Sequence, residues 1–394
     1  MSALMRMEVG IMRALMFASV ASMVDLFNRD NMDMLEELGC KVDVAANFTE
    51  GSVYNKEQAD AFAIEMKKAG REVINVPIPR TMYNIKDMVK TIKILRKHMS
   101  VKHYDIVHCQ SPIGGVLCRI ACAPYRKEGM KVLYYAHGFH FFKGADLFYW
   151  LVFYNIEKLC AHLTDCLITL NKEDYTRAAE NFKTEVCYMK GVGLDLQEIY
   201  DVPVDRNGVR KELGLSEDTK IIVSVSELSR RKNCMTCLQA FAKAGRNDAV
   251  LLFLGIGEQM DMLKEEAKKL GVSDKVIFAG FRNDVIRIMK ASDVYIFSSK
   301  QEGLPVSLMQ AMACKLPVLV SRIRGNTDLI ENKKQGFMFS YDNSDAYAKG
   351  INKLLDNPKL CKRMGDVNGE VIKGYDKEPV NKMMKDLYIK LLHS

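Results

Sequence analysis

Short apolar runs alternate with longer segments of helical periodicity along almost the whole chain, and this alternation limits the fold more than any other feature. Strands separated by helical segments of this length form βαβ units, in which the strands run parallel. The first series of expected strands covers residues 13–18, 41–45, 104–108, 131–136, 165–169 and 185–189. The second series covers residues 220–226, 250–254, 275–278, 293–297, 317–321 and 336–339. The pattern predicts an α/β protein with two parallel sheets.

A linker separates the two series at residues 191–208, which contain three glycines and one proline and lack sustained periodicity. We therefore expect an N-terminal Rossmann-like domain at residues 1–192 and a second one at residues 193–375. Residues 376–394 carry a final helical pattern, which we expect to pack back on the first domain. Residues 1–11 precede the first strand and are expected to form an extension. Parallel α/β sheets bind ligands beyond the carboxyl ends of their strands, so the site should lie in a cleft between the domains.

Length and composition exclude several classes of protein. The chain has 394 residues, which is more than one hydrophobic core usually organises. Hydrophobic residues make up 48% and charged residues 27%, far from the composition of disordered or collagen-like chains. No apolar stretch reaches the roughly 18 residues that a membrane-spanning helix needs. The eleven cysteines are scattered, and the lone pair Cys234 and Cys237 predicts a helix face rather than a zinc site, so we expect reduced thiols in a cytoplasmic protein.

The basic residues are unevenly distributed. They exceed the acidic ones by eight, 57 against 49, which is too small an excess for an obligate nucleic-acid binder of this length. Residues 65–143 alone hold 15 basic residues against 5 acidic ones. This region suits anionic substrates or a phospholipid surface, although solvated helix faces explain the same charges. The aromatic run at residues 147–154 is typical of a core helix and also fits an interfacial membrane patch.

The segment at residues 298–314, SSKQEGLPVSLMQAMAC, follows an expected strand and leads into a helix. Pro305 suits the first helical position, so we expect the helix to begin near Leu304. Gly303 lets a ligand approach the amides of that helix end, whose dipole attracts a diphosphate. Glu302 can accept hydrogen bonds from sugar hydroxyls, and Gln310 can reach a second polar group of the same ligand. A strand–turn–helix with a solvated glutamate and glutamine is the alternative interpretation.

A basic turn follows another expected strand, in VSVSELSRRKNCMT at residues 223–236. It places Arg230, Arg231 and Lys232 at a strand end, where cations can neutralise a leaving diphosphate. A basic surface turn explains the same residues. In the first half, His137 ends a strand in YYAHGFHFFKG and can hydrogen-bond a sugar or a phosphate, although a histidine at a strand end is more often structural.

Two common kinds of nucleotide site are not supported. Gly255 and Gly257 follow a strand as in the dinucleotide fingerprint, but Met260 stands where its third glycine would be. The sequence has no P-loop, and no two aspartates are separated by a single residue, as an Asp-x-Asp metal clamp requires. The sequence therefore predicts a diphosphate site that needs neither a metal nor a cofactor.

Seven segments occur together in a characteristic order: FASVASMVDLFN with VDVAANF, YDIVHCQSPIGGVL, YYAHGFHFFKGA, ITLNKEDYTRA, KGVGLD, SELSRRKN and EGLPVSLMQAMA. They resemble the family 4 glycosyltransferases of the two-Rossmann GT-B architecture, in particular the bacterial capsular and exopolysaccharide branch. The resemblance covers nearly the whole chain. It implies transfer of a hexose or N-acetylhexosamine from a UDP-sugar to a lipid-diphosphate-linked glycan at the inner face of the cytoplasmic membrane. It also implies retention of anomeric configuration without a metal.

The resemblance assigns roles to several residues. Glu302 matches the glutamate that contacts the donor sugar, and Gly303 and Leu304 match the positions where the backbone approaches the sugar and phosphate. Lys232 matches the diphosphate-binding lysine. His137 matches the histidine of the first domain that faces the donor.

Other positions are less regular. Arg282, in GFRNDV, lies where the family usually lines the nucleotide base. Gln310 stands where the family usually has a second glutamate for the ribose hydroxyls, so we expect weaker donor binding. Glu227 stands where many members have a diphosphate-binding arginine, and Arg231 or Arg230 is expected to supply that charge.

The resulting hypothesis is a same-face substitution. The C1–O bond to UDP loosens, the acceptor hydroxyl enters on that face, and a phosphate oxygen takes its proton. Lys232, Arg231 and the helix beginning near Pro305 stabilise the departing diphosphate, while Glu302 and His137 orient the sugar. Two alternatives stay open: a non-catalytic nucleotide-sugar-binding partner of a polysaccharide assembly complex, and a UDP-sugar epimerase that needs no acceptor.

Overall fold

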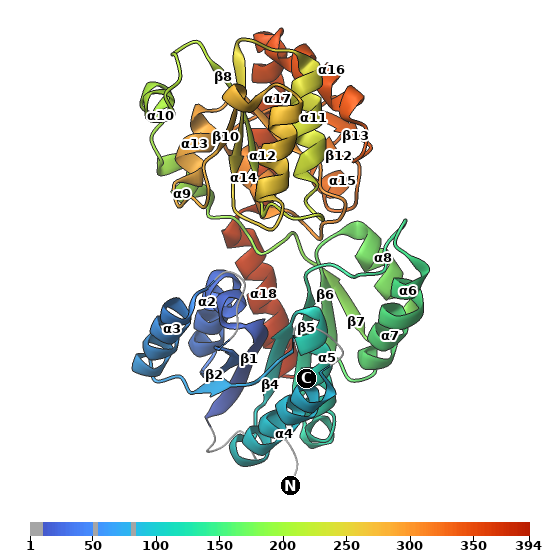
Figure 1. Cartoon of the computed structure of the whole chain (residues 1–394). Helices are drawn as coiled ribbons and strands as arrows, with labels where there is room; N and C mark the ends of the chain where they lie inside the picture. Colours follow the sequence, from blue (N-terminus) through green and yellow to red (C-terminus); the bar gives the residue numbers. More distant parts are fainter. Residues whose placement is uncertain (1–10, 50–53, 80–83) are drawn as a thin grey trace. The chain divides into compact units, whose positions relative to one another are not determined.

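The computed structural model describes residues 11–49, 54–79 and 84–394, which form two compact units (Figure 1). The first unit consists of residues up to Val192 together with Glu378–Ser394, and the second consists of Gly193–Lys377. The expectation that residues 1–11 form an extension falls, except for Ile11, outside the described residues.

Seven parallel strands form the sheet of the first unit, in the order β3-β2-β1-β4-β5-β6-β7. In chain order the strands are β1 Met12–Val20, β2 Cys40–Asn47, β3 Val73–Asn75, β4 Ile106–Gln110, β5 Lys131–Ala136, β6 Cys166–Thr169 and β7 Glu185–Tyr188. The helices are α2 Ala21–Glu37, α3 Lys56–Lys68, α4 Ile85–Lys102, α5 Pro112–Cys122, α6 Leu147–Tyr149, α7 Asn155–Ala161, α8 Lys172–Asn181 and α18 Lys377–Leu392. A short π-helix, Trp150–Tyr154, joins α6 to α7.

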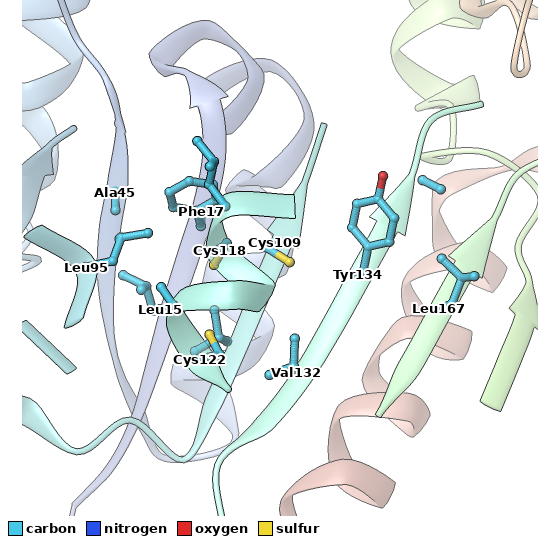
Figure 2. Close-up of a cluster of buried hydrophobic side chains, with 14 of the residues drawn as sticks. Leu15, Phe17, Ala45, Leu95, Cys109, Cys118, Cys122, Val132, Tyr134 and Leu167 are labelled. Atoms are coloured by element: carbon cyan, nitrogen blue, oxygen red, sulfur yellow. The ribbon is translucent and has the colours of Figure 1, made fainter. Parts of the chain in front are cut away.

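Both faces of this sheet are covered, which explains the continuous apolar runs of its central strands. On one face Leu15 and Val132 belong to a core cluster with Leu95 of α4 and Cys118 of α5 (Figure 2). Val107 of β4 belongs to the same cluster. On the other face His108 meets Tyr388 of α18, with 2.7 Å between His108 Nδ1 and the tyrosine oxygen. Alternate residues of one strand thus serve two different helical layers.

The aromatic run at residues 147–154 is divided between core and solvent. Trp150, Phe153 and Tyr154 pack against the core cluster of the first unit. Leu147 and Leu151 on the same stretch are 70% and 62% exposed. The run is therefore partly a core helix, as predicted, and partly an exposed apolar surface.

Six parallel strands form the sheet of the second unit, in the order β10-β9-β8-β11-β12-β13. The strands are β8 Lys220–Val225, β9 Ala249–Leu254, β10 Val276–Phe278, β11 Val294–Phe297, β12 Val318–Ser321 and β13 Gly336–Phe339. The helices are α9 Leu196–Asp201, α10 Arg206–Glu212, α11 Cys234–Ala244, α12 Met260–Lys269, α13 Val285–Ala291, α14 Val306–Ala313, α15 Asn326–Leu329, α16 Ser344–Leu355 and α17 Pro358–Ile372. The predicted architecture, α/β with two Rossmann-like parallel sheets, is present.

Two local expectations were wrong or incomplete, and one was confirmed. The short strand β3 was not predicted, because its three residues are too few to show alternation. The expected linker at residues 191–208 contains α9 and the start of α10, which are capped by Asp195 and Asp205. The cysteines Cys234 and Cys237 do lie buried on one helix, α11, as predicted.

Within the described ranges, no helix is both long and apolar enough to cross a membrane.

Candidate functional site

The candidate site of the second unit lies at the point where the strand order of its sheet reverses. From β8 the chain proceeds outward through β9 and β10, and it then returns to β11 on the other side of β8. The loops that follow β8 and β11 consequently leave the carboxyl edge of the sheet side by side, which is the usual ligand position in such sheets. The first loop carries the basic turn, and the second carries the EGLP segment.

Glu302, in the loop after β11, contacts two cations of the loop after β8. Its Oε1 atom lies 2.8 Å from Lys232 Nζ and 3.3 Å from Arg231 Nη1, and it accepts a hydrogen bond of 2.6 Å from Ser299 Oγ. The Glu302 side chain is only 8% exposed, whereas that of Arg231 is 47% exposed. Glu302 Oε2 makes no hydrogen bond within the described residues. The cluster therefore combines a buried carboxylate with cations that retain access to solvent.

Asn233 and Ser298 bind the two loops to each other. Asn233 adopts the left-handed conformation with φ 56°, and its Nδ2 donates to the carbonyl oxygens of Ser298 at 3.0 Å and Tyr341 at 2.7 Å. Ser298 Oγ donates in return to the Asn233 carbonyl at 2.7 Å. Asparagine tolerates this conformation better than most residues, so the basic turn is fixed before any ligand arrives. The sequence analysis missed this role, although Asn233 follows Lys232 directly.

Two glycine contacts close the loops around the cluster. A Cβ on Gly325, which has φ 77°, would lie 2.5 Å from the carbonyl oxygen of Gly303. A Cβ on Gly255 would lie 1.9 Å from the carbonyl oxygen of Ser226. Gly255, noted above as part of an incomplete dinucleotide fingerprint, thus allows the loop after β9 to pack on the loop after β8.

Helix α14 begins one turn after Glu302. It starts at Val306, and Pro305 is the residue before it, with an extended ψ of 114°, so the expected start near Leu304 was early. The Pro305 carbonyl accepts the first helical hydrogen bonds, from Leu308 and Met309. No side chain caps this end of the helix. Its first amides are therefore available to a ligand at the same strand end as the cation cluster.

The remaining predicted donor residues lie in different surroundings. Leu304 is buried, and Gln310 is half-buried within α14. Arg282 follows β10, two strands away from β8, and its guanidinium is held by Asp284 and Glu212 at 2.7 Å each. These two carboxylates raise the pKa of Arg282. The structure therefore brings Lys232, Arg231 and Glu302 together, while Arg282 belongs to a separate ion-pair network.

His137 follows β5 at the carboxyl edge of the other sheet, in the first unit. Its Nε2 lies 2.6 Å from Oε1 of Gln110, the last residue of β4. Burial lowers the pKa of His137 to about 4, so the ring is neutral near pH 7. The sequence analysis missed Gln110. Its position at the end of an apolar strand, two residues after His108, is the signal that could have identified a polar group there.

Among the described residues there is no group of three or more histidine, cysteine, aspartate or glutamate side chains arranged to hold a metal ion. What the second unit does offer is two cations, a free helix end and a buried carboxylate. Together these groups can bind a diphosphate and accept hydrogen bonds from hydroxyl groups.

Comparisons with known proteins cover both units. The model of the family described as Glycosyl transferases group 1 matches residues 205–369, and that of Glycosyltransferase Family 4 matches residues 29–185. The chain is 34% identical to the putative glycosyltransferase EpsD of Bacillus subtilis (strain 168), over 80% of this chain and 84% of the relative.

A second relative and a solved structure extend the comparison. An Escherichia coli protein named UDP-Gal:alpha-D-GlcNAc-diphosphoundecaprenol alpha-1,3-galactosyltransferase is 29% identical over 79% of this chain and 82% of its own. The crystal structure of Anabaena Alr3699/HepE in complex with UDP and glucose superposes with a TM-score of 0.76 at 18% identity. It covers 96% of this chain and 100% of that chain, which shows a shared fold.

Proposed function

Because the chain belongs to the group 1 glycosyltransferases of family 4, with the GT-B architecture, we propose that it transfers a hexose or N-acetylhexosamine from a UDP-sugar to a lipid-diphosphate-linked glycan. The observation that carries the proposal is the cluster of Lys232 and Arg231 on Glu302 at the point where the strand order of the sheet reverses. The names of two relatives support it, since one is a putative EpsD glycosyltransferase and another a galactosyltransferase acting on a diphosphoundecaprenol-linked sugar. The product would be an extended lipid-linked glycan, an intermediate in capsular polysaccharide or exopolysaccharide synthesis.

The charges favour a diphosphate as the leaving group. Lys232 and Arg231 converge on one carboxylate oxygen, so two long side chains are already oriented before a donor binds. Such preorganised cations stabilise charge that develops on a leaving group at no reorganisation cost. The uncapped amides of α14 add a further positive end. We propose that this set serves in place of a metal ion, and that no cofactor takes part.

The proposed reaction retains the anomeric configuration. Glu302 and His137 orient the sugar, the bond from C1 to the diphosphate oxygen breaks, and the acceptor hydroxyl forms the new bond on the same face. The hydroxyl proton passes to a phosphate oxygen of the departing UDP. No protein side chain becomes covalently attached in this scheme. The protein contributes orientation and electrostatic stabilisation.

The test is UDP release by the purified chain from a panel of UDP-sugars, with and without a lipid-diphosphate-linked acceptor. We expect acceptor-stimulated release, which the Glu302→Ala variant loses. Binding of a donor without release under any condition would favour a non-catalytic partner of an assembly complex instead. Conversion of one UDP-sugar into another without an acceptor would favour an epimerase. An NMR spectrum of the anomeric proton of the first product decides between retention and inversion.

We also propose that the first unit attaches to the cytoplasmic face of a membrane through α4. The side chains of Lys86, Lys90, Lys93 and Lys97 recur at intervals of four, three and four residues, which places them on one stripe. All four are exposed, and none lies in an ion pair within the described residues. The opposite side of the helix, with Leu95 and Met99, is buried. An anionic lipid surface complements this lysine stripe.

An apolar surface belongs to the same helical layer. Helix α4 packs on α5, which packs on α7, and their inner residues share one core cluster. At the far side of this layer, Leu147, Phe148 and Leu151 are 54% to 70% exposed. Exposed aliphatic and aromatic side chains are typical of interfacial membrane attachment.

Flotation with phosphatidylcholine vesicles, with and without phosphatidylglycerol, tests this attachment. We expect binding only to the anionic vesicles, lost at high salt, and lowered more than tenfold when the four lysines of the stripe become glutamine, because each contributes about 1 kcal/mol. The matched control replaces four exposed lysines of the second unit that form no ion pair with any described residue, Lys211, Lys268, Lys349 and Lys359. Equal losses in both variants would show that net charge, and not the stripe, attaches the protein.

A further inference from the structure

Gln110 is placed to control the chemistry of His137. It ends β4, which pairs with β5, and its side chain is 1% exposed. Its Oε1 lies 2.6 Å from His137 Nε2. Its amide nitrogen makes no hydrogen bond within the described residues. The oxygen is thus the atom of the Gln110 amide that serves the histidine.

A neutral imidazole carries one proton, and its position decides what the ring can bind. Burial lowers the pKa of His137 to about 4, so the neutral form prevails near pH 7. An amide oxygen accepts a hydrogen bond and cannot donate one. The proton therefore lies on Nε2, and Nδ1 keeps a lone pair. Nδ1 makes no hydrogen bond to any described residue.

We propose that Gln110 is a positioning residue that holds His137 in the Nε2–H tautomer, and that His137 Nδ1 accepts a hydrogen bond from a hydroxyl of a sugar substrate. The diphosphate oxygens of a UDP-sugar carry no proton at neutral pH, so they cannot donate a hydrogen bond to Nδ1. The sequence left a sugar or a phosphate open for His137, and the proposed tautomer favours the sugar. The assignment of a sugar hydroxyl as the partner of Nδ1 rests on the proposed function, whereas the assignment of the His137 tautomer does not.

The rings around His137 are consistent with this role. Tyr135 and Phe27 lie with ring centroids 4.9 Å and 6.1 Å from it. These neighbours limit the rotation of the imidazole, so a substrate hydroxyl meets the lone pair in a fixed direction. The nearby His108 is also neutral, since burial lowers its pKa to about 3.

The first experiment assigns the tautomer by nitrogen-15 NMR of the imidazole rings in the full chain. We expect a proton on Nε2 of His137 in the wild type and in Gln110→Glu, which keeps an acceptor oxygen. We expect both tautomers in Gln110→Leu. His108, which contacts Tyr388 and not Gln110, serves as the internal control and keeps its signals. A proton on Nδ1 of His137 in the wild type overturns the proposal.

The second experiment identifies the hydroxyl. Turnover is measured with deoxy analogues of the UDP-sugar in one arm and deoxy analogues of the acceptor glycan in the other, for the wild type and His137→Ala. We expect one hydroxyl whose removal lowers kcat/KM about three- to tenfold in the wild type and hardly at all in His137→Ala. Gln110→Leu should show the intermediate loss, and Gln110→Glu should restore turnover.

Different results refute the two parts of the proposal. Equal losses with every deoxy substrate in both proteins overturn the sugar hydroxyl as the partner of Nδ1. Absence of transfer with all donors overturns the proposed function together with the assignment of a sugar hydroxyl. The NMR measurement still decides the role of Gln110 in that case, because it needs no substrate.

Discussion

Two ion pairs with a buried carboxylate, one in each unit, differ in how many of their hydrogen-bonding atoms are paired within the protein. In the first unit Arg119 is 1% exposed and donates to Glu157 at 2.7 Å and to the Gly115 carbonyl at 3.0 Å, with its guanidinium 3.8 Å above the Tyr134 ring. Tyr134 in turn donates to the second oxygen of Glu157 at 3.1 Å. In the second unit Arg231 is half exposed, and one oxygen of Glu302 has no hydrogen-bond partner in the part of the chain that the structure describes.

The difference separates a structural pair from a functional one. In the Arg119 pair both carboxylate oxygens of Glu157 accept hydrogen bonds from buried protein groups, so this carboxylate has little to offer a ligand. The Glu302 cluster keeps cations at a strand end, where the strand order of the sheet reverses. A buried pair that is complete contributes to stability when intact, while an incomplete one retains binding capacity. The comparison predicts that mutations at the two sites act on different quantities.

The largest expected effect is on folding. Glu157→Ala leaves the Arg119 guanidinium buried without its carboxylate, so we expect the free energy of unfolding to fall by about 3–5 kcal/mol. Urea unfolding followed by the fluorescence of Trp150, the single tryptophan, measures it in the same unit. UDP release per folded molecule should stay near the wild-type value. The control is Asp386→Ala, which breaks an exposed pair with Lys382 and should cost less than 1 kcal/mol. An unchanged free energy of unfolding in Glu157→Ala would show that the Arg119 pair does not stabilise the fold.

The next effect is on turnover. Lys232→Ala removes the cation nearest to Glu302, and we expect UDP release to fall about 100-fold, by analogy with the loss of one preorganised donor. Stability should change little, because Arg231 and Ser299 still serve the carboxylate. The matched control is Lys243→Ala, which breaks a surface pair with Asp345 in the same unit. Unchanged turnover with an intact circular dichroism spectrum would remove Lys232 from the mechanism.

The sequence predicted most of the fold for a physical reason. Buried parallel strands are continuously apolar, so twelve of the described strands were identifiable, whereas β3 has too few residues to show a pattern. The same reasoning placed the basic turn and the EGLP segment at the same end of the second sheet.

The site was less predictable in its details. The sequence analysis identified Lys232, Arg231 and Glu302 separately. It did not show that both cations contact one carboxylate oxygen. The contacts of Gln110 and Asn233 depend on strand adjacency, and the turn that Asn233 fixes depends on a left-handed backbone. Such contacts join residues far apart in the chain, so spacing alone does not reveal them.

A third effect concerns pH and should separate the two units. His108 and His137 are neutral in the folded first unit, with pKa values lowered by burial to about 3 and about 4. The unfolded chain has histidine pKa values near 6.5, so it takes up these protons first as the pH falls. Their contribution to stability is complete above about pH 6.5 and declines below it. From pH 7 to 5.5 we expect a loss of about 2 kcal/mol in total.

Urea unfolding at a series of pH values, again followed through Trp150, measures this loss. His108→Gln should remove about half of the pH dependence, because it leaves only one buried titratable ring. The neighbouring Tyr135 and Tyr388 stay protonated throughout, since burial raises their pKa values. An unaltered slope in His108→Gln would show that these rings are not the source.

The smallest expected effect is on the affinity for UDP when a negative charge is added near the Glu302 cluster. Gln310 stands where the family usually has a second glutamate, and it is half-buried in α14 beside the proposed ribose site. A carboxylate accepts stronger hydrogen bonds from hydroxyl groups than an amide oxygen does, so Gln310→Glu should bind UDP about three- to tenfold more tightly. Isothermal titration calorimetry measures the affinity. Gln301→Glu adds the same charge in the preceding loop, at a position to which we assign no contact with the ribose. This variant should lower the affinity for UDP, because the added carboxylate repels the diphosphate. If both variants bind more weakly, added negative charge dominates at this strand end, and the cluster is already balanced between its cations and Glu302.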